Sequence, residues 1–174
     1  MVISLQDVVK RDIQHIVQDS ISHFTCRDDD VESFLKTKAF DFERRNKSRT
    51  YLIMDGNILS GYFTLSLKAL PFSSDVSKNT IKSIDGYSKD VSAIGIILIG
   101  QFGKDKVFAK GIDGSKLFDI CIDMVYQAQA IIGGRFVVLE CRRIEKVVAF
   151  YKRKGFVLLQ NDEREEYLQM VRRL

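Results

Sequence analysis

Hydrophobic residues recur at helical spacing in the first quarter of the chain. One series predicts an amphipathic helix over the first twenty residues, and its members are Leu5, Val8, Val9, Ile13, Ile16 and Val17. A second series predicts a helix that follows three consecutive aspartates, Asp28 to Asp30, and its members are Val31, Phe34, Leu35, Ala39 and Phe42. Acidic side chains suit the positive N-terminal end of a helix, so we expect the aspartates to cap this second helix.

The middle of the chain changes to runs typical of strands. Two β-rich runs, Thr50 to Met54 and Ile58 to Leu67, surround the turn Asp55-Gly56-Asn57 and predict a β-hairpin. Pro71 to Lys89 is rich in serine and holds the chain's only proline, so we expect a loop with room for one short helix. Ala93 to Phe102 is almost continuously apolar, which predicts a central strand buried on both faces.

Helices and strands alternate in the last third. Apolar spacing predicts a helix from near Gly114 to the Gly133-Gly134 pair, and a later helix around Ile144 to Tyr151 that ends at Gly155. Short strands are expected at 136–139, 156–159 and 167–171. The whole pattern predicts an α+β protein, with a mixed, mostly antiparallel sheet flanked by helices in one domain over residues 1–174.

Composition narrows the class of protein. The chain has 174 residues, 45% of them hydrophobic, which is enough for a core without disulfides or metal. Its longest apolar run is far too short for a transmembrane helix, and the start lacks the order of a signal peptide, so we expect a cytoplasmic protein without a membrane partner. Three cysteines without a CxxC pair, and two histidines, predict neither a disulfide framework nor a metal site.

The net charge of +4 is unevenly distributed. Residues 1–48 hold 8 basic and 9 acidic side chains, whereas residues 142–174 hold 9 basic and 5 acidic, and residues 104–116 hold 4 basic and 2 acidic. The basic C-terminal segment is either a solvated helix face or a surface for a polyanion such as RNA or a cofactor phosphate.

The basic loop lies between the apolar strand and the next helix. It contains Gly111, Asp113, Gly114 and Ser115, and such a loop presents unpaired backbone N–H groups at a helix N-terminus, which favours an anion. The alternative is an ordinary connection that uses glycines for turning, since the loop matches neither GxxxxGK[ST] nor GxGxxG. Asp113 opposes anion binding unless its side chain caps its own helix.

A second candidate is the segment Ala149-Phe150-Tyr151-Lys152-Arg153-Lys154-Gly155-Phe156. Tyr151 lies one turn before the end of the predicted helix at Gly155, beside three basic residues. It is either a core residue or a proton donor.

These two segments together resemble the GNAT superfamily of N-acetyltransferases. Gly103 to Leu117 is similar to the family's acetyl-coenzyme A motif, and the "AFYxxxGF" element is similar to its C-terminal motif. The segments Ser48-Arg49-Thr50-Tyr51 and Gly61-Tyr62-Phe63-Thr64-Leu65-Ser66 are similar to the branch that contains acetyltransferase toxins of bacterial toxin-antitoxin pairs.

The resemblance implies a set of site residues. Backbone groups of Phe102, Gly103 and Lys104 would pair with the pantetheine arm of acetyl-CoA, and the amides of Gly111, Asp113, Gly114 and Ser115 would hold its pyrophosphate. Tyr151 would donate a proton to the departing thiolate. The loop departs from the family pattern, because Ala109 and Ile112 stand where the family has Gln or Arg and a glycine.

We therefore expect transfer of an acetyl group from acetyl-CoA to a primary amine by direct attack. The acceptor is a small molecule, a protein amine or, if the protein is a toxin, an aminoacyl-tRNA, with an antitoxin as a further partner and Arg49 as a phosphate contact. The resemblance also allows a homodimer. The stretch Ile94 to Phe102 contains no acidic residue to act as general base, so water or the amine's own deprotonation would have to serve. Glu140 and Cys141 end the next strand, where they either face the acceptor cavity or have structural roles, and we expect the structural roles. The alternative is a non-catalytic module with the same fold that binds a protein or RNA.

Overall fold

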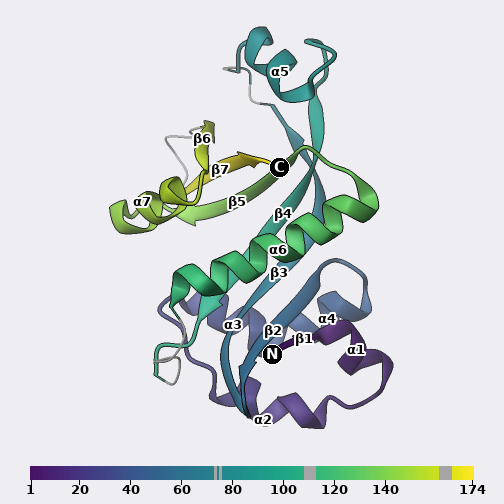
Figure 1. Ribbon diagram of the computed structural model, residues 1–174, viewed down its shortest axis with the longest axis vertical. Coiled ribbons are helices and arrows are strands. Elements are labelled where there is room, and N and C mark those ends of the chain that lie inside the picture. The colour runs from purple at the N-terminus through teal and green to yellow at the C-terminus, as the bar shows by residue number, and fades with distance from the viewer. Residues whose placement is uncertain (73, 75, 108–112, 161–165) are drawn as a thin grey trace. The chain divides into compact units, whose positions relative to one another are not determined.

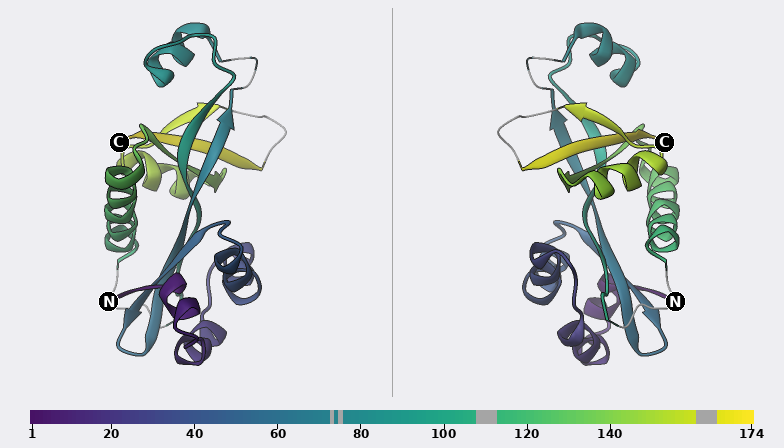
Figure 2. Two further views of the ribbon diagram at one scale, coloured as in Figure 1. Left: turned by 90° about the vertical axis from the view of Figure 1, so that its right-hand side faces the viewer. Right: turned by 90° about the vertical axis from the view of Figure 1, so that its left-hand side faces the viewer.

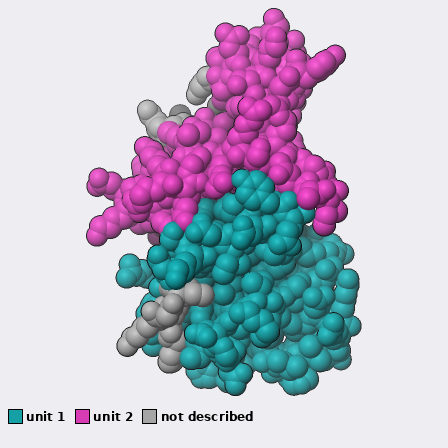
Figure 3. Space-filling view, viewed as in Figure 1, with its two compact units in different colours: residues 1–66, 99–127 teal, residues 67–98, 128–174 magenta. Residues whose placement is uncertain are grey.

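The computed structural model describes residues 1–72, 74, 76–107, 113–160 and 166–174. These residues form two compact units, shown in Figure 3. Unit 1 comprises 1–66 and 99–127, and unit 2 comprises 67–98 and 128–174. Two strands and one helix have residues in both units. The prediction of one domain stays a prediction.

Unit 1 contains the first 66 residues of the chain, the end of one strand and most of the long helix that follows it (Figure 1). Its complete elements are β1 (Val2–Ser4), α1 (Leu5–Lys10), α2 (His15–His23), α3 (Asp29–Thr37), α4 (Ala39–Arg44) and β2 (Arg49–Asp55). It also holds most of β3 (Ile58–Pro71) and α6 (Gly114–Ile132), and the end of β4 (Ala93–Lys104). The strand order within the unit is β1-β2-β3-β4, so β4 lies at one end of the unit's sheet.

The two helices predicted at the N-terminus are each interrupted. Residues 2–4 form β1, which pairs antiparallel with β2, and Asp12 adopts the left-handed conformation (φ 54°) between α1 and α2. The second helix is capped as predicted, because Asp28 Oδ1 accepts the amides of Asp30 (3.1 Å) and Val31 (3.4 Å), but it breaks at Lys38 (φ −121°). Periodicity identified the apolar face correctly, yet it does not report where the backbone leaves helical geometry.

The predicted hairpin is confirmed. β2 and β3 pair antiparallel in the register Thr50↔Thr64, and the turn between them contains Gly56 at φ +57°. The register shifts between Ile53 and Met54, which marks a bulge close to the turn.

Helices cover both faces of the sheet in unit 1 (Figure 2). Consecutive residues of β3 point to opposite faces. A Cβ on Gly61 would overlap the side chain of Leu117 in α6, whereas the Tyr62 hydroxyl donates to the Val31 carbonyl of α3 and its ring contacts Phe24 edge-on at 5.6 Å. The core on the Tyr62 face joins α1–α4 to the strands through residues that include Leu5, Ile21 and Leu52.

Unit 2 contains the remaining parts of β3, β4 and α6, with α5 (Lys78–Asp85), β5 (Phe136–Arg142), α7 (Glu145–Arg153), β6 (Val157–Gln160) and β7 (Tyr167–Arg173). Its strand order is β3-β4-β5-β7-β6. β7 pairs antiparallel with both β5 and β6, so every strand pair whose register is described is antiparallel, as predicted. The predicted helix ends are also confirmed: Gly155 (φ +83°) follows α7, and Gly133 (φ +75°) follows α6. The expected short helix in the serine-rich loop is α5.

The prediction for β4 was correct in position and partly wrong in burial. Within unit 2 the strand lies between β3 and β5, but Ala93 and Gly95 are exposed while Ile94 and Ile96 are buried. Alanine and glycine continue an apolar run in the sequence without needing burial, so they hid the alternation of a strand with one solvated face.

The described residues were also compared with what a membrane span, a disulfide and a metal site require. No described helix has the length and hydropathy to cross a bilayer. The three cysteines are free and buried. Among the described residues no three His, Cys, Asp or Glu side chains are grouped so as to hold a metal ion.

Candidate active site

The end of β4 provides a close-packed strand end in unit 1. The half-buried ring of Phe102 meets Phe118 of α6 edge-on at 5.1 Å. Gly103 points to the other face, where a Cβ would lie 2.7 Å from Val31 Cγ1 and 3.2 Å from Tyr62 Cε1. Only glycine fits this position. Lys104, the last residue of the strand, is half-buried.

Directly after the strand lies a buried carboxylate that the sequence analysis did not single out. Asp105 is 3% exposed. Its Oδ2 accepts the Thr25 amide (2.9 Å) and hydroxyl (3.4 Å), and its Oδ1 accepts the Val107 amide (2.8 Å). Its own amide donates to the Ser60 carbonyl of β3 (2.9 Å). An acidic residue directly after an apolar strand was the available signal, but its partner lies 80 positions away.

The start of α6 is capped by Asp113. Its carbonyl accepts the Leu117 amide (3.1 Å), and its exposed side chain accepts the Ser115 amide through Oδ1 (3.2 Å). The predicted helix start at Gly114 is therefore confirmed, with Asp113 as its cap. An anion at this helix end competes with the Asp113 carboxylate for the Ser115 amide. Gly111 lies outside the described residues.

The charge around this strand and helix start is mixed. Lys106 and Lys116 are exposed, and Lys104 is half-buried, while Asp113 places one negative charge at the helix end. Lys110 lies outside the described residues. With the buried Asp105, three cations lie near two carboxylates, which leaves a positive excess of one charge that suits a phosphate ligand.

Tyr151 lies in unit 2, on α7. Its side chain is 8% exposed and makes edge-on contacts with Phe150 (5.2 Å) and Phe156 (6.1 Å). Its carbonyl accepts the amides of Lys154 (3.0 Å) and Phe156 (3.1 Å), which ends the helix. The other described site residues belong to unit 1.

The remaining candidate side chains already have partners within their units. Glu140 is exposed, accepts Gln169 Nε2 (3.1 Å) and lies 4.0 Å from Lys68 Nζ. Arg49 donates to Glu43 (2.7 Å) and Asn46 (2.8 Å), so two of its nitrogens are engaged within unit 1. This arrangement favours a structural role for Arg49 over the expected phosphate contact.

Cys121 and Cys141 make poor nucleophiles. Burial raises the pKa of the Cys121 thiol, which lies on the packed face of α6, and it also raises the pKa of Cys141. The thiolate is the reactive form, and a raised pKa suppresses it. Cys141 Sγ lies 3.6 Å from Met170 Sδ in the core.

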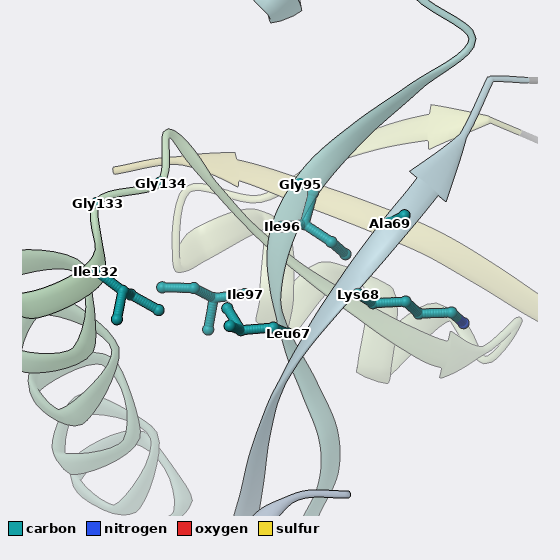
Figure 4. A pocket seen from close by; sticks show the side chains of 9 residues that line it. All are labelled: Leu67, Lys68, Ala69, Gly95, Ile96, Ile97, Ile132, Gly133 and Gly134. Atoms are coloured by element: carbon teal, nitrogen blue, oxygen red, sulfur yellow. The ribbon is translucent and has the colours of Figure 1, made fainter.

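Unit 2 carries an apolar pocket of about 400 Å³. Three short segments line it, from β3, β4 and the end of α6 (Figure 4). They are Leu67 to Ala69, Gly95 to Ile97 and Ile132 to Gly134. None of the predicted site residues belongs to this lining.

Comparison with known proteins identifies the fold. No family model and no curated protein matches the chain. Among solved structures, a Tyr-to-Phe mutant of KacT is 25% identical, with a TM-score of 0.67 over 86% of this chain and 85% of that one. The toxin AtaT complexed with acetyl-methionyl-tRNAfMet is 23% identical, with a TM-score of 0.65 over 86% and 85%. A Tyr-to-Phe mutant of AtaT bound to acetyl-CoA and to the C-terminus of the antitoxin AtaR is 21% identical, with a TM-score of 0.63 over 86% and 83%.

The chain thus has the GNAT-like α+β fold of these toxins. The resemblance drawn from the two sequence motifs, including its toxin branch, is confirmed at the level of the fold.

Proposed function

We propose that the protein is an N-acetyltransferase that transfers the acetyl group of acetyl-CoA to a primary amine. The observation that carries the proposal is that the 19-residue helix α6 follows the end of β4, in a fold shared with a toxin structure that holds acetyl-CoA. A strand end followed by a long helix N-terminus offers backbone groups to an extended arm and to a phosphate.

The proposed cofactor residues lie at the end of β4 and the start of α6. Backbone groups of Phe102, Gly103 and Lys104, the last residues of β4, would pair with the pantetheine arm. The pyrophosphate would lie at the start of α6, on amides that include those of Gly114 and Ser115. We also assign the Gly111 amide, which the sequence resemblance implies, to the pyrophosphate. No metal takes part in the proposal.

The reaction is a direct attack. The amine nitrogen forms a bond to the thioester carbonyl carbon, the carbon–sulfur bond breaks, and the amine loses one proton to water. We assign Tyr151 as the donor of the proton that the departing coenzyme A thiolate takes up. General acid help of this kind typically contributes about 100-fold to 10,000-fold.

The sequence of β4 bears on the acceptor. Ala93 to Phe102 contains no carboxylate to remove a proton from the amine. An α-amino group has a pKa of about 8 and a lysine amine one of about 10.4, so at pH 7.5 the α-amino group is neutral a few hundred times more often. An enzyme without a base on this strand is therefore better suited to an α-amino group than to a lysine.

We infer that this α-amino group belongs to an aminoacyl-tRNA. AtaT, which shares the fold, is recorded with acetyl-methionyl-tRNAfMet. In unit 2 exposed basic side chains lie on and beside α7, where they suit contact with RNA phosphates, namely Arg143, Lys146, Lys152 and Arg153. An antitoxin, as in the AtaT complex with AtaR, and a second copy of the chain are the further partners that we propose.

A calorimetric titration of the protein with acetyl-CoA tests the proposal. We expect saturable binding, followed by acetylation of aminoacyl-tRNA and growth arrest when the protein is expressed without an antitoxin. Absence of binding at millimolar acetyl-CoA would instead establish the non-catalytic module, which the Asp113 carboxylate on the Ser115 amide favours.

The role of Tyr151 is tested by Tyr151→Phe. Loss of the proton donor should lower kcat about 100-fold and leave the Kd for acetyl-CoA within twofold, since the ring remains. Tyr87→Phe is the matched control, because Tyr87 is 92% exposed in the same unit. Equal turnover of Tyr151→Phe and the control would remove Tyr151 from the mechanism.

A further inference from the structure

Asp105 is a buried carboxylate that directly follows β4 and links the end of this strand to Thr25. Three donors face its two oxygens: the Thr25 amide, the Thr25 hydroxyl and the Val107 amide. A carboxylate that is 3% exposed loses its hydration, and these bonds replace it.

The bonds run in both directions between Asp105 and the segment that joins α2 to α3. While Asp105 accepts from Thr25, the Lys106 amide donates to the Thr25 carbonyl (2.9 Å). The next amide of that segment, Cys26 N, donates to Glu32 Oε2 (2.8 Å). Two successive residues of this segment are therefore tied by carboxylates, one from α3 and one from the strand end.

The same tie includes β3. The Asp105 amide donates to Ser60 O (2.9 Å), two residues before Tyr62, whose ring would lie 3.2 Å from a Cβ at Gly103. The position of the β4 end is thus determined from three sides: by β3, by the Thr25 segment and by the packing around Gly103.

We propose that Asp105 is a positioning residue for acetyl-CoA: it holds the backbone of Gly103 and Lys104 where the pantetheine arm pairs. This proposal rests on the proposed function, and it adds a residue that makes no contact with the cofactor itself. A strand end that is fixed before binding loses less conformational entropy when the arm pairs with it, which tightens binding.

The negative charge is required, as well as the shape. The Thr25 amide, the Thr25 hydroxyl and the Val107 amide all donate to Asp105, and a carboxylate is an acceptor only. In Asp105→Asn the amide NH₂ would meet at least one of these donors, so one contact becomes a repulsion and the strand end is released at nearly constant volume.

The test compares Asp105→Asn with Glu43→Gln. Glu43 is also 3% exposed in unit 1, and it accepts the Thr50 amide (2.9 Å) and the Arg49 guanidinium (2.7 Å), far along the chain from the strand end. We expect both variants to melt at lower temperature than the wild type. Only Asp105→Asn should raise the calorimetric Kd for acetyl-CoA, by about tenfold, with kcat at saturating acetyl-CoA changed less than twofold.

Several results overturn the proposal. One is a Kd for Asp105→Asn within twofold of the wild type, and another is an equal rise for Glu43→Gln, which would mean that any loss of stability weakens binding. If Asp105→Asn does not fold, Thr25→Val decides: it removes only the hydroxyl contact, and we expect a twofold to threefold rise in Kd, whereas no rise refutes the role. The wild-type titration comes first, because absence of binding there refutes the proposed function itself.

Discussion

The Asp113 side chain provides the sharpest test of where the cofactor phosphate binds. Its carboxylate accepts the Ser115 amide at 3.2 Å, so a pyrophosphate bound to the same helix end would bring two negative charges close together. Asparagine caps a helix about as well as aspartate. Asp113→Asn should therefore remove the repulsion and preserve the helix.

The size of the effect follows from Coulomb's law. Two unit charges about 4 Å apart interact by about 1 kcal/mol in water and by about 4 kcal/mol at the dielectric constant of a protein surface. Because Asp113 is exposed, we take the value near 1 kcal/mol. This corresponds to a Kd for acetyl-CoA about fivefold tighter in Asp113→Asn, since about 1.4 kcal/mol is a factor of ten.

The assay is a calorimetric titration at 0.15 M salt, repeated at low salt, where the gain should increase. Asp123→Asn is the control. This exposed residue lies on the same helix, ten residues further on and so about 15 Å along the axis, which exceeds the Debye length of about 8 Å at 0.15 M salt. The two variants are therefore compared with each other at 0.15 M salt. If the two variants bind acetyl-CoA equally, or if Asp113→Asn binds more weakly than the wild type, the phosphate does not lie at this helix end.

Two predictions concern stability. In Gly61→Ala the new methyl would overlap Leu117 and lie 2.7 Å from the Gly103 carbonyl oxygen, so urea unfolding should show a free energy of unfolding lower by about 1–3 kcal/mol. In the control Gly95→Ala, where nothing lies within 4 Å of the new methyl, the free energy of unfolding should change by less than about 0.5 kcal/mol. Equal losses in the two variants would contradict the packing argument. Glu32 has a lowered pKa, first because Lys36 donates to it at 2.7 Å and then because the Cys26 amide does. The stability that the Glu32 carboxylate contributes is thus present above its ordinary pKa of 4.5 and is lost as pH falls through the lower folded pKa. Glu32→Gln should therefore lower the free energy of unfolding by about 1 kcal/mol at pH 7 and by little at pH 2. An equal loss at both pH values would contradict this sign.

Local patterns in the sequence were sufficient to predict the helices and strands of the last third of the chain and the helix start in the candidate site. The start of α6 at Gly114 and the glycines that follow α6 and α7 were correctly predicted, because caps and left-handed glycines act within a few residues of the helix end. The N-terminal helices were less predictable. β1 exists only because residues 50 positions away pair with it, and periodicity contains no record of such a partner.

The sequence by itself determined the GNAT-like class, the apolar faces of the helices, and the choice of Gly103, Asp113 and Tyr151 as residues to test. Only the tertiary structure decided that the Arg49 guanidinium is engaged by Glu43 and Asn46. It alone showed that Asp105 is buried against Thr25, 80 residues earlier. The physical reason is that the sequence around a charged side chain does not show whether the side chain stays hydrated. Folding determines whether it remains in water or is buried, where hydrogen bonds from distant residues replace its hydration.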